Sequence, residues 1–424
     1  MKIGAAKVCT STTNPDVRLA GFGNPLRTFK GMHDDLWVRA LVLENEGKTV
    51  AIVTGDALGF ESQRIEEIRP AIAEKTGLSV DAILFNASHT HSAPNVMRGQ
   101  SEKIGRYNAE YADWFYTRVV EVIAAAYADL EEGTLEMGFA TCYGVGVNRR
   151  RLLTGAYEFA PYEAGIRRDE AFVLRAVCNG RVKAILSKLT CHPSTIGFDY
   201  GSADWPGVAR RIIEEKNPGT IAFFTQGCCG NIRVRTVKDP AQLDTTSFRG
   251  GTYEDIETFG KLLADAAQTV LDGRMEPLKG SFASKKITFE LPLQEKPARE
   301  VYAANREGDS LEAYSNRWYY EHYDELTDTK PYTMQRIDLG DKLTLIAMEG
   351  EVVVEYEYHM DKLLPDRKVV TLGYSNGNPG YICTAEMYKY GGYEPVDSAV
   401  CYMLREGWKP ESEQIILDNA KRLL

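Results

Sequence analysis

The amino-acid sequence predicts an α/β protein with a large mixed β-sheet core flanked by helices, forming a single domain over residues 1–424. Short apolar, strand-like runs alternate with amphipathic helical patterns in the first half of the chain. Longer β-like runs follow after about residue 275, and the sequence contains no repeat, low-complexity tract or flexible linker. We therefore expect the last third of the chain to complete the same functional site as the first half.

The first half supplies most of the expected strands and helices. The expected strands span residues 37–43, 49–54, 81–86, 172–177, 182–189 and 220–225. The expected helices span residues 64–75, 108–130, 206–216 and 253–271. Asn179-Gly180 predicts a tight hairpin between two of the strands, because both residues readily adopt positive φ angles.

The last third has longer strand-like runs and two further helices. The expected strands span residues 281–291, 333–339, 343–348 and 368–372. One polar, aromatic helix is expected over residues 298–325, and an amphipathic helix over residues 410–424.

Composition and charge exclude several classes of partner. The formal net charge is -10 and the only dense basic run is Arg149-Arg150-Arg151, which argues against nucleic acid. No apolar stretch approaches the roughly 20 residues that span a bilayer, so we expect no stable membrane insertion. The eight cysteines form no C-x-x-C pair and the N-terminus lacks an apolar signal region, which favours the cytoplasm. The oligomeric state stays open, a homo-oligomer included.

The segment Ser88-His-Thr-His-Ser-Ala-Pro94 is the first candidate for chemistry. In an extended segment, His89 and His91 lie two residues apart and point to the same side. Imidazole is a common zinc ligand and also titrates near neutrality, so either metal binding or acid–base work is compatible with this pair. Two ordinary loop histidines remain the competing interpretation.

A third histidine and a carboxylate complete a candidate metal site. His192 follows the expected strand 182–189, and strand ends are where sites form in α/β proteins. A catalytic zinc usually takes three protein ligands and keeps one position open. Glu351, after the expected strand 343–348, is the candidate carboxylate, with Glu349 and Glu355 as local competitors and an ordinary surface acid as the alternative.

Two further features have both structural and functional interpretations. Asp204 stands where a helix should begin, so it is either a helix cap or a site residue. Tyrosine is dense between Tyr381 and Tyr393, in an irregular glycine-rich stretch. These phenols could ligate a metal, donate a hydrogen bond to an oxyanion, or simply line a cleft.

Taken in order, the motifs resemble the catalytic domain of the neutral (non-lysosomal) ceramidases, a family of zinc amidases. The segments that carry the resemblance are Leu19-Ala-Gly-Phe22, residues 31–40, residues 53–59, residues 88–94, Val147-Asn-Arg149, residues 226–231, Gly350-Glu351 and residues 375–384. The resemblance implies a ceramidase-like catalytic domain, in a shorter chain that ends where the ceramidases continue into an immunoglobulin-like domain.

The resemblance also implies roles for individual residues. The implied zinc ligands are His89, His192, Glu351 and Tyr381. The implied neighbours of the reacting carbonyl are His91, Arg149 and Tyr393, with Gly21 approaching the substrate through its backbone. Arg233 stands where the family has its proposed serine nucleophile, which is a departure from the pattern.

The resulting hypothesis is a zinc-dependent hydrolase that cleaves an amide or related bond in a small polar or acidic substrate. Zinc would polarise the carbonyl and activate water, while His91 or Asp204 shuttles the proton. Tyr393 and Arg149 would hold the oxyanion, and Arg233 would bind an acidic or polyol group of the substrate. Two alternatives stay open: a zinc-assisted glycoside hydrolase or lyase acting on an acidic sugar, and a catalytically inactive metal-binding protein.

Overall fold

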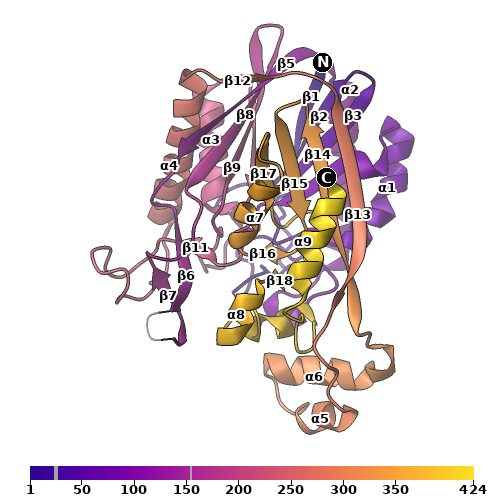
Figure 1. The fold of residues 1–424 in the computed structure, drawn as a ribbon, viewed down its shortest axis with the longest axis vertical. Helices are drawn as coiled ribbons and strands as arrows, with labels where there is room; N and C mark the ends of the chain where they lie inside the picture. The colour runs from indigo at the N-terminus through magenta and orange to yellow at the C-terminus, as the bar shows by residue number, and fades with distance from the viewer. Residues whose placement is uncertain (23–26, 153–154) are drawn as a thin grey trace.

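The computed structural model describes residues 1–22, 27–152 and 155–424, and it confirms the mixed α/β architecture (Figure 1). The largest sheet has nine strands in the order β10-β9-β8-β5-β1-β2-β3-β4, with β12 paired to β5. Its strands are β1 (Lys2–Cys9), β2 (Trp37–Asn45), β3 (Lys48–Gly55), β4 (Ile83–Ala87), β5 (Glu131–Thr141), β8 (Glu170–Cys178), β9 (Arg181–Leu189), β10 (Ile221–Gln226) and β12 (Glu276–Leu278).

The expected hairpin is present between β8 and β9. Asn179 and Gly180 have φ angles of 50° and 76°, which two-residue hairpin loops require. In the middle of the sheet, β1 and β5 pair only through two residue pairs, Lys2 with Glu132 and Ile3 with Glu131. The nine strands therefore form two halves that meet at this short junction.

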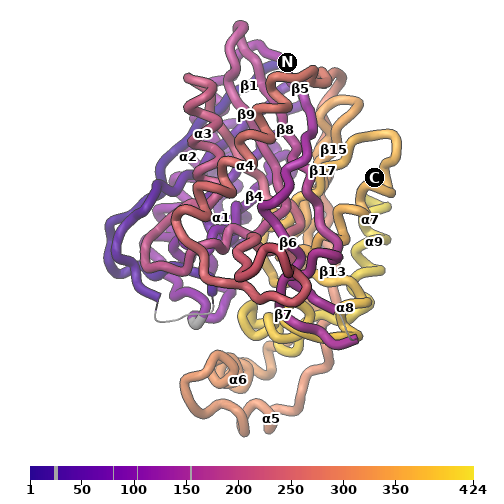
Figure 2. The backbone as a smooth tube through the Cα atoms, turned by 90° about the vertical axis from the view of Figure 1, so that its left-hand side faces the viewer, coloured from indigo at the N-terminus to yellow at the C-terminus, as the bar shows by residue number. Residues whose placement is uncertain are grey.

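Both faces of the large sheet are covered, and the alternation of apolar side chains along β2 shows why. Val38, Ala40 and Val42 belong to the core beneath the helices, whereas Leu41 and Leu43 belong to the core beneath a second sheet. The covering helices are α1 (Ser62–Thr76), α2 (Ala109–Ala128), α3 (Asp204–Lys216) and α4 (Tyr253–Asp272). Figure 2 shows these helices on one side of the molecule and the C-terminal third on the other.

The C-terminal third forms the second sheet, in the order β13-β14-β15-β17. Its strands are β13 (Phe282–Pro292), β14 (Thr329–Leu339), β15 (Leu343–Met348) and β17 (Lys368–Leu372). Helix α7 (Glu355–Leu363) contacts β17, and helix α9 (Ser412–Leu423) contacts β13. No helix in the described ranges is long and apolar enough to cross a membrane.

The prediction of one helix over residues 298–325 is wrong. The segment forms α5 (Arg299–Ala304), α6 (Leu311–Glu321) and the short 3-10 helix η3 (Tyr323–Glu325), which project from the body in Figure 1. The chain turns at Gly308, whose φ is 99°, and Ser310 then caps the new helix by accepting a hydrogen bond from the Ala313 amide.

Two small sheets lie where the site forms. One has the order β11-β6-β7 and consists of β6 (Gly146–Leu152), β7 (Tyr157–Tyr162) and β11 (Ile232–Val234). The other pairs β16 (Glu351–Val352) with β18 (Tyr381–Ile382). The remaining short elements are η1 (Val80–Ala82), η2 (Glu102–Ile104), α8 (Ala385–Tyr390) and η4 (Asp397–Tyr402).

Candidate metal centre and active site

His89 follows β4 in a backbone conformation that aims its ring inward. Its φ is 66°, which is uncommon for a residue with a side chain, and its amide bonds to the Ala57 carbonyl at 3.0 Å. Nδ1 lies 2.6 Å from the Leu58 carbonyl oxygen. That contact assigns the proton to Nδ1 and leaves Nε2 free to face the centre of the cluster.

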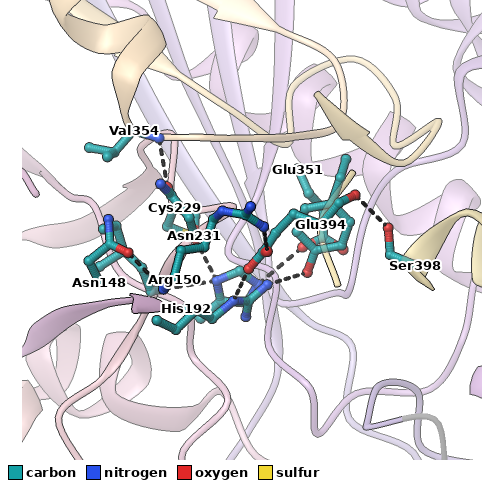
Figure 3. A network of polar contacts seen from close by, with 12 residues as sticks. Asn148, Arg150, His192, Cys229, Asn231, Glu351, Val354, Glu394 and Ser398 are labelled. Atoms are coloured by element: carbon teal, nitrogen blue, oxygen red, sulfur yellow. Dashed lines mark hydrogen bonds and ion pairs between the residues drawn. The ribbon is translucent and has the colours of Figure 1, made fainter. Parts of the chain in front are cut away.

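His192 follows β9 and is held in the same way. Its Nδ1 lies 2.6 Å from the Cys229 carbonyl oxygen and 2.9 Å from the Ile232 carbonyl oxygen, so Nε2 again points inward (Figure 3). Cys229 belongs to the turn after β10, and Ile232 is the first residue of β11, which follows that turn. Gly230 in this turn is essential to the close packing, because a Cβ there would lie 2.5 Å from the carbonyl oxygen of Glu351.

Glu351 supplies a buried carboxylate to the two fixed imidazoles. Its Oε2 lies 3.0 Å from Nε2 of His192 and 3.3 Å from Nε2 of His89. Burial disfavours the charged carboxylate, yet the facing His89 and His192 hold the pKa of Glu351 well below its usual range. The preceding Gly350 has a φ of 86°, which allows the sharp turn from β15 into β16.

Glu349 and Glu355, the other candidate carboxylates near Glu351 in the sequence, bond to residues outside the histidine cluster. Glu349 accepts a hydrogen bond from the Thr333 amide at 2.9 Å, and Glu355 accepts from the side chain of Asn231. Neither carboxylate bonds to the imidazoles in the described part of the chain. Glu349 precedes the turn at Gly350, whose φ is 86°, and Glu355 begins α7, so neither occupies a strand position equivalent to that of Glu351.

His91 joins the cluster, and its environment differs from that of His89 and His192. Its Nε2 lies 3.1 Å from Nε2 of His89, and one nitrogen of each of the three rings lies within 4.8 Å of the others. Burial and the neighbouring His89 and His192 hold the pKa of His91 well below its ordinary value. In contrast to the other two rings, its Nδ1 has no hydrogen-bond partner within the described residues.

The donor set fits a metal ion. Burial, followed by the nearby Arg149 cation, lowers the pKa of His192 to about 4, so its imidazole is neutral and can donate a lone pair. Imidazole nitrogens and a carboxylate around a single centre are ligands that zinc accepts.

Three tyrosines surround the Glu351 carboxylate. Tyr381 is the register partner of Glu351, and its phenol oxygen accepts a 2.8 Å hydrogen bond from Nη2 of Arg149. Tyr374 donates to Oε2 of Glu351 at 3.3 Å, and Tyr402 donates to Oε1. Sequence reasoning identified Tyr381 as a candidate but missed the other two, because Tyr374 follows β17 and Tyr402 ends the short helix η4 without belonging to a motif.

Arg149 is held rigidly beside Tyr381. Its Nε lies 2.7 Å from Glu394, whose other oxygen lies 2.6 Å from Arg150. The guanidinium also lies over the ring of Tyr393, with its Cζ 5.5 Å from the ring centroid. Tyr393, an expected site residue, therefore lies beside Arg149, whereas Glu394, its neighbour in sequence, was not singled out.

Asp204 and Gly21, two of the expected site residues, form hydrogen bonds with residues other than the clustered histidines. The Asp204 carboxylate accepts hydrogen bonds from the Thr195 amide, the Thr195 hydroxyl and the Trp205 amide at 2.9, 2.6 and 2.7 Å. Across the described ranges, no hydrogen bond links it to the imidazoles. Gly21 lies against the ring of His91, and its amide donates to the Ile104 carbonyl at 2.8 Å.

Arg27 is a further residue that sequence reasoning missed. Its guanidinium donates to the hydroxyl of Ser92 at 2.9 Å and to the carbonyl oxygen of His91. It also donates to the carbonyl of Phe198, so one buried side chain fixes the loop that carries His91. No motif surrounds Arg27, and only the three-dimensional arrangement shows its position.

The sequence of the first half matches a known family. Residues 1–239 match the family described as "Neutral/alkaline non-lysosomal ceramidase, N-terminal". The chain belongs to this family. It is therefore a member of a hydrolase family, and the three clustered histidines of this ceramidase relative fit a metal site.

Individual relatives agree with the assignment. The chain is 23% identical over 291 residues to neutral ceramidase B of Dictyostelium discoideum, a match that covers 61% of this chain and 40% of that protein. The crystal structure of the neutral ceramidase from Pseudomonas aeruginosa superposes with a TM-score of 0.78 at 18% identity, covering 100% of this chain and 74% of the other. A ceramidase complexed with C2 superposes with the same TM-score at 17% identity. At these identities the structural matches establish the ceramidase fold.

Proposed function

We propose that this protein is a zinc-dependent hydrolase that cleaves amide bonds. The observation that carries the proposal is the convergence of the Nε2 atoms of His89 and His192 on one oxygen of Glu351. Structural reinforcement of both rings by backbone carbonyls is the arrangement expected around metal ligands. A bound zinc ion would polarise the substrate carbonyl and lower the pKa of water.

The proposed ligands are His89, His192, Glu351 and Tyr381. The first three supply the short contacts that define the centre. The phenol of Tyr381 stands beside Glu351 in the β16–β18 pair, and Arg149 donates a hydrogen bond to it. Burial raises the pKa of Tyr381 well above its usual range, and the nearby Arg149 cation opposes this rise by stabilising negative charge on the phenol oxygen.

We assign the proton transfer to Nε2 of His91. A ligand histidine normally has its second nitrogen fixed by a hydrogen bond, as His89 and His192 have, whereas Nδ1 of His91 is unpartnered within the described residues. Its lowered pKa keeps the ring neutral near pH 7 and able to accept a proton. Asp204 is the weaker candidate, because its carboxylate is occupied by Thr195 and Trp205.

Arg149 and Tyr393 would stabilise the developing oxyanion. The Arg149 guanidinium is immobilised by Glu394, so little reorganisation accompanies the reaction. Tyr393 packs edge to face on Tyr381, with ring centroids 5.5 Å apart. Loss of one such donor typically costs about 3 kcal/mol of transition-state stabilisation, or roughly a hundredfold in rate.

The proposed bond is an amide because the matched relatives are named as ceramidases, and ceramide is an N-acyl compound. This chain spans 40% of the length of the Dictyostelium relative, so the name of that relative alone does not identify the substrate of this chain.

The test separates metal binding from proton transfer. Metal content and amide hydrolysis are measured for the wild type and for His89→Ala, His192→Ala and His91→Ala. His89→Ala and His192→Ala should lose both metal and activity. His91→Ala should keep its metal and lose activity. The matched control is His322→Ala, because His322 stacks on Trp318 in the projecting α6 segment and should change neither quantity.

Three results would contradict parts of the proposal. Full metal content in both His89→Ala and His192→Ala would remove the metal site. Loss of metal in His91→Ala would make His91 a ligand and leave the proton step unassigned. A wild-type protein that binds zinc but hydrolyses no amide would fit the inactive metal-binding alternative.

A further inference from the structure

Arg233 directly follows Ile232, whose carbonyl oxygen contacts the proposed metal ligand His192. It lies on β11, where it pairs with Val147 of β6. The preceding residue, Ile232, supplies one of the carbonyl oxygens that hold the ring of His192. The position of Arg233 is therefore fixed by the same strand that orients a proposed metal ligand.

The guanidinium of Arg233 lies over the ring of Phe248, which packs against Phe159 with ring centroids 5.9 Å apart, and it has no polar partner among the described residues. Its Cζ lies 4.6 Å from the ring centroid of Phe248 and 5.9 Å from that of Phe159. Over residues 1–22, 27–152 and 155–424, no hydrogen bond or ion pair reaches its side chain, and its Nε is buried without an acceptor. Buried polar groups in proteins are normally paired, so an unpaired guanidinium needs a reason.

The surrounding charge is also unbalanced. The guanidinium of Arg149 lies over the same Phe159 ring, with its Cζ 5.2 Å from the centroid. Arg149 and Arg150 share the single carboxylate of Glu394. Burial and the neighbouring Arg149 lower the pKa of Arg233 to about 10, which leaves it charged at neutral pH. Arg233 is half-buried beside other cations, and an anionic ligand would reduce this local excess of positive charge.

We propose that Arg233 is the recognition site for a carboxylate carried by the substrate. This inference rests on the proposed amide hydrolysis and narrows its substrate to amides that bear a free carboxylate, such as N-acylated amino acids. Arg233 is half-buried and, of its nitrogens, only Nε is buried without a partner, so the outer edge of the guanidinium is free to meet a planar carboxylate with two parallel hydrogen bonds. A phosphate is a poorer match, because the neighbouring Arg149 and Arg150 are already committed to Glu394.

Arg235 provides a matched control on the same segment. It lies two residues further along, and its guanidinium also lies over an aromatic ring, that of Tyr143. In contrast to Arg233, it has a carboxylate partner, Glu163, at 2.9 Å. Replacing Arg235 therefore removes a paired surface cation and leaves the proposed subsite intact.

The first experiment compares matched substrates. Hydrolysis of N-acetyl amino acids with spacers of different length is measured against hydrolysis of the corresponding primary carboxamides. The wild type should prefer the carboxylates, and Arg233→Met, which keeps an unbranched aliphatic side chain against Phe248, should lose about 10-fold to 100-fold in kcat/KM on the carboxylates only. Arg233→Lys should recover part of the loss, and Arg235→Gln should behave as the wild type.

The second experiment measures binding and does not depend on turnover. Hexanoate, inorganic phosphate and the neutral hexan-1-ol are titrated calorimetrically into the wild type, Arg233→Met and Arg235→Gln. Hexanoate should bind the wild type and Arg235→Gln, bind Arg233→Met about 10-fold or more weakly, and outcompete phosphate.

The outcomes separate this inference from the proposed function. Arg233-dependent hexanoate binding in a protein that hydrolyses no amide would overturn the proposed function and keep the carboxylate site. Equal hydrolysis of carboxylates and carboxamides, unchanged in Arg233→Met, would overturn the carboxylate site and keep the hydrolase. Tighter binding of phosphate than of hexanoate, or hexanoate binding that survives in Arg233→Met, would also overturn the carboxylate site.

Discussion

Glu351 and Tyr381 are direct partners in the two-stranded parallel sheet of β16 and β18. The pairing fixes the carboxylate and the phenol side by side, although 29 residues separate them in the sequence (381 minus 351, less one). Arg149 reaches across from β6 to donate to Tyr381, and Glu394 holds Arg149 in turn. The positions of the site residues thus depend on contacts between the first half and the last third of the chain.

Replacing Glu394 with Gln should destabilise the protein strongly. The substitution leaves Arg149 and Arg150 without their buried counter-ion, and breaking a buried ion pair typically costs about 3–5 kcal/mol. Chemical denaturation measures the change in the free energy of unfolding. The control is Glu158→Gln, because Glu158 pairs with Arg151 through a side chain that is 62% exposed and should cost less than about 1 kcal/mol. Equal effects of the two substitutions would contradict this account of the buried pair.

Tyr381→Phe should weaken zinc binding while leaving the fold intact. Removal of the phenol oxygen deletes a proposed ligand, and we expect a loss of affinity of about 10-fold to 100-fold. Competition with a chelator of known affinity measures it. Tyr302→Phe is the matched control, because Tyr302 is buried in α5 and its hydroxyl has no partner among the described residues. Unchanged affinity in Tyr381→Phe would remove Tyr381 from the ligand set.

Gly21→Ala should lower activity by displacing the ring of His91, in addition to the cost of placing alanine at a positive φ. A Cβ at Gly21 would lie 2.6 Å from Cγ of His91, and the φ of Gly21 is 89°. Gly47→Ala is the control for the backbone cost, because Gly47 has a φ of 73° and open space around it. We expect Gly47→Ala to cost about 1–2 kcal/mol of stability with normal activity, and Gly21→Ala to retain metal with much reduced kcat. Normal kcat in Gly21→Ala would show that His91 tolerates displacement.

Asp204 should make the protein less stable as the pH rises. Burial outweighs its hydrogen bonds with Thr195 and Trp205 and raises its pKa to about 6, above an unfolded value near 4. Because the folded state holds the proton more tightly, the stabilisation is complete below about pH 4 and is lost as the pH rises through about 6. The shift of about two pH units corresponds to roughly 3 kcal/mol.

The measurement compares Asp204→Asn with the wild type by chemical denaturation between pH 4 and pH 7. The free energy of unfolding of the wild type, relative to the variant, should fall across this range, because Asn does not titrate. A difference that rises with pH would show that the folded state favours the ionised carboxylate.

The fold class and the centre of the site were predictable from local patterns. The alternation of strands and helices and the hairpin at Asn179-Gly180 follow from short-range rules, and the structure confirms the α/β fold. His89, His192 and Glu351 were candidates because each follows an apolar strand, and the structure brings the three side chains together. The family resemblance is also confirmed, over residues 1–239.

The strands, helices and site residues that the sequence did not predict depend on contacts between residues that are far apart in the sequence. β6 contains Arg149, Arg150 and Arg151 in a row, so its sequence lacks the apolar alternation of a strand. Tyr402 reaches Glu351 from a short 3-10 helix whose position is set by packing. The long helix expected over residues 298–325 failed because aromatic residues continue across the turn at Gly308. Local propensity could not show that tertiary packing divides this segment.

The most direct test of the metal centre is X-ray absorption spectroscopy on the zinc-loaded wild type, with the zinc content of the same sample measured by elemental analysis. The site predicts one zinc ion per chain, imidazole ligands from His89 and His192, and oxygen ligands in place of sulfur, although Cys191 and Cys229 lie close by. A protein that takes up no zinc, or a spectrum dominated by sulfur ligands, would contradict the site described here.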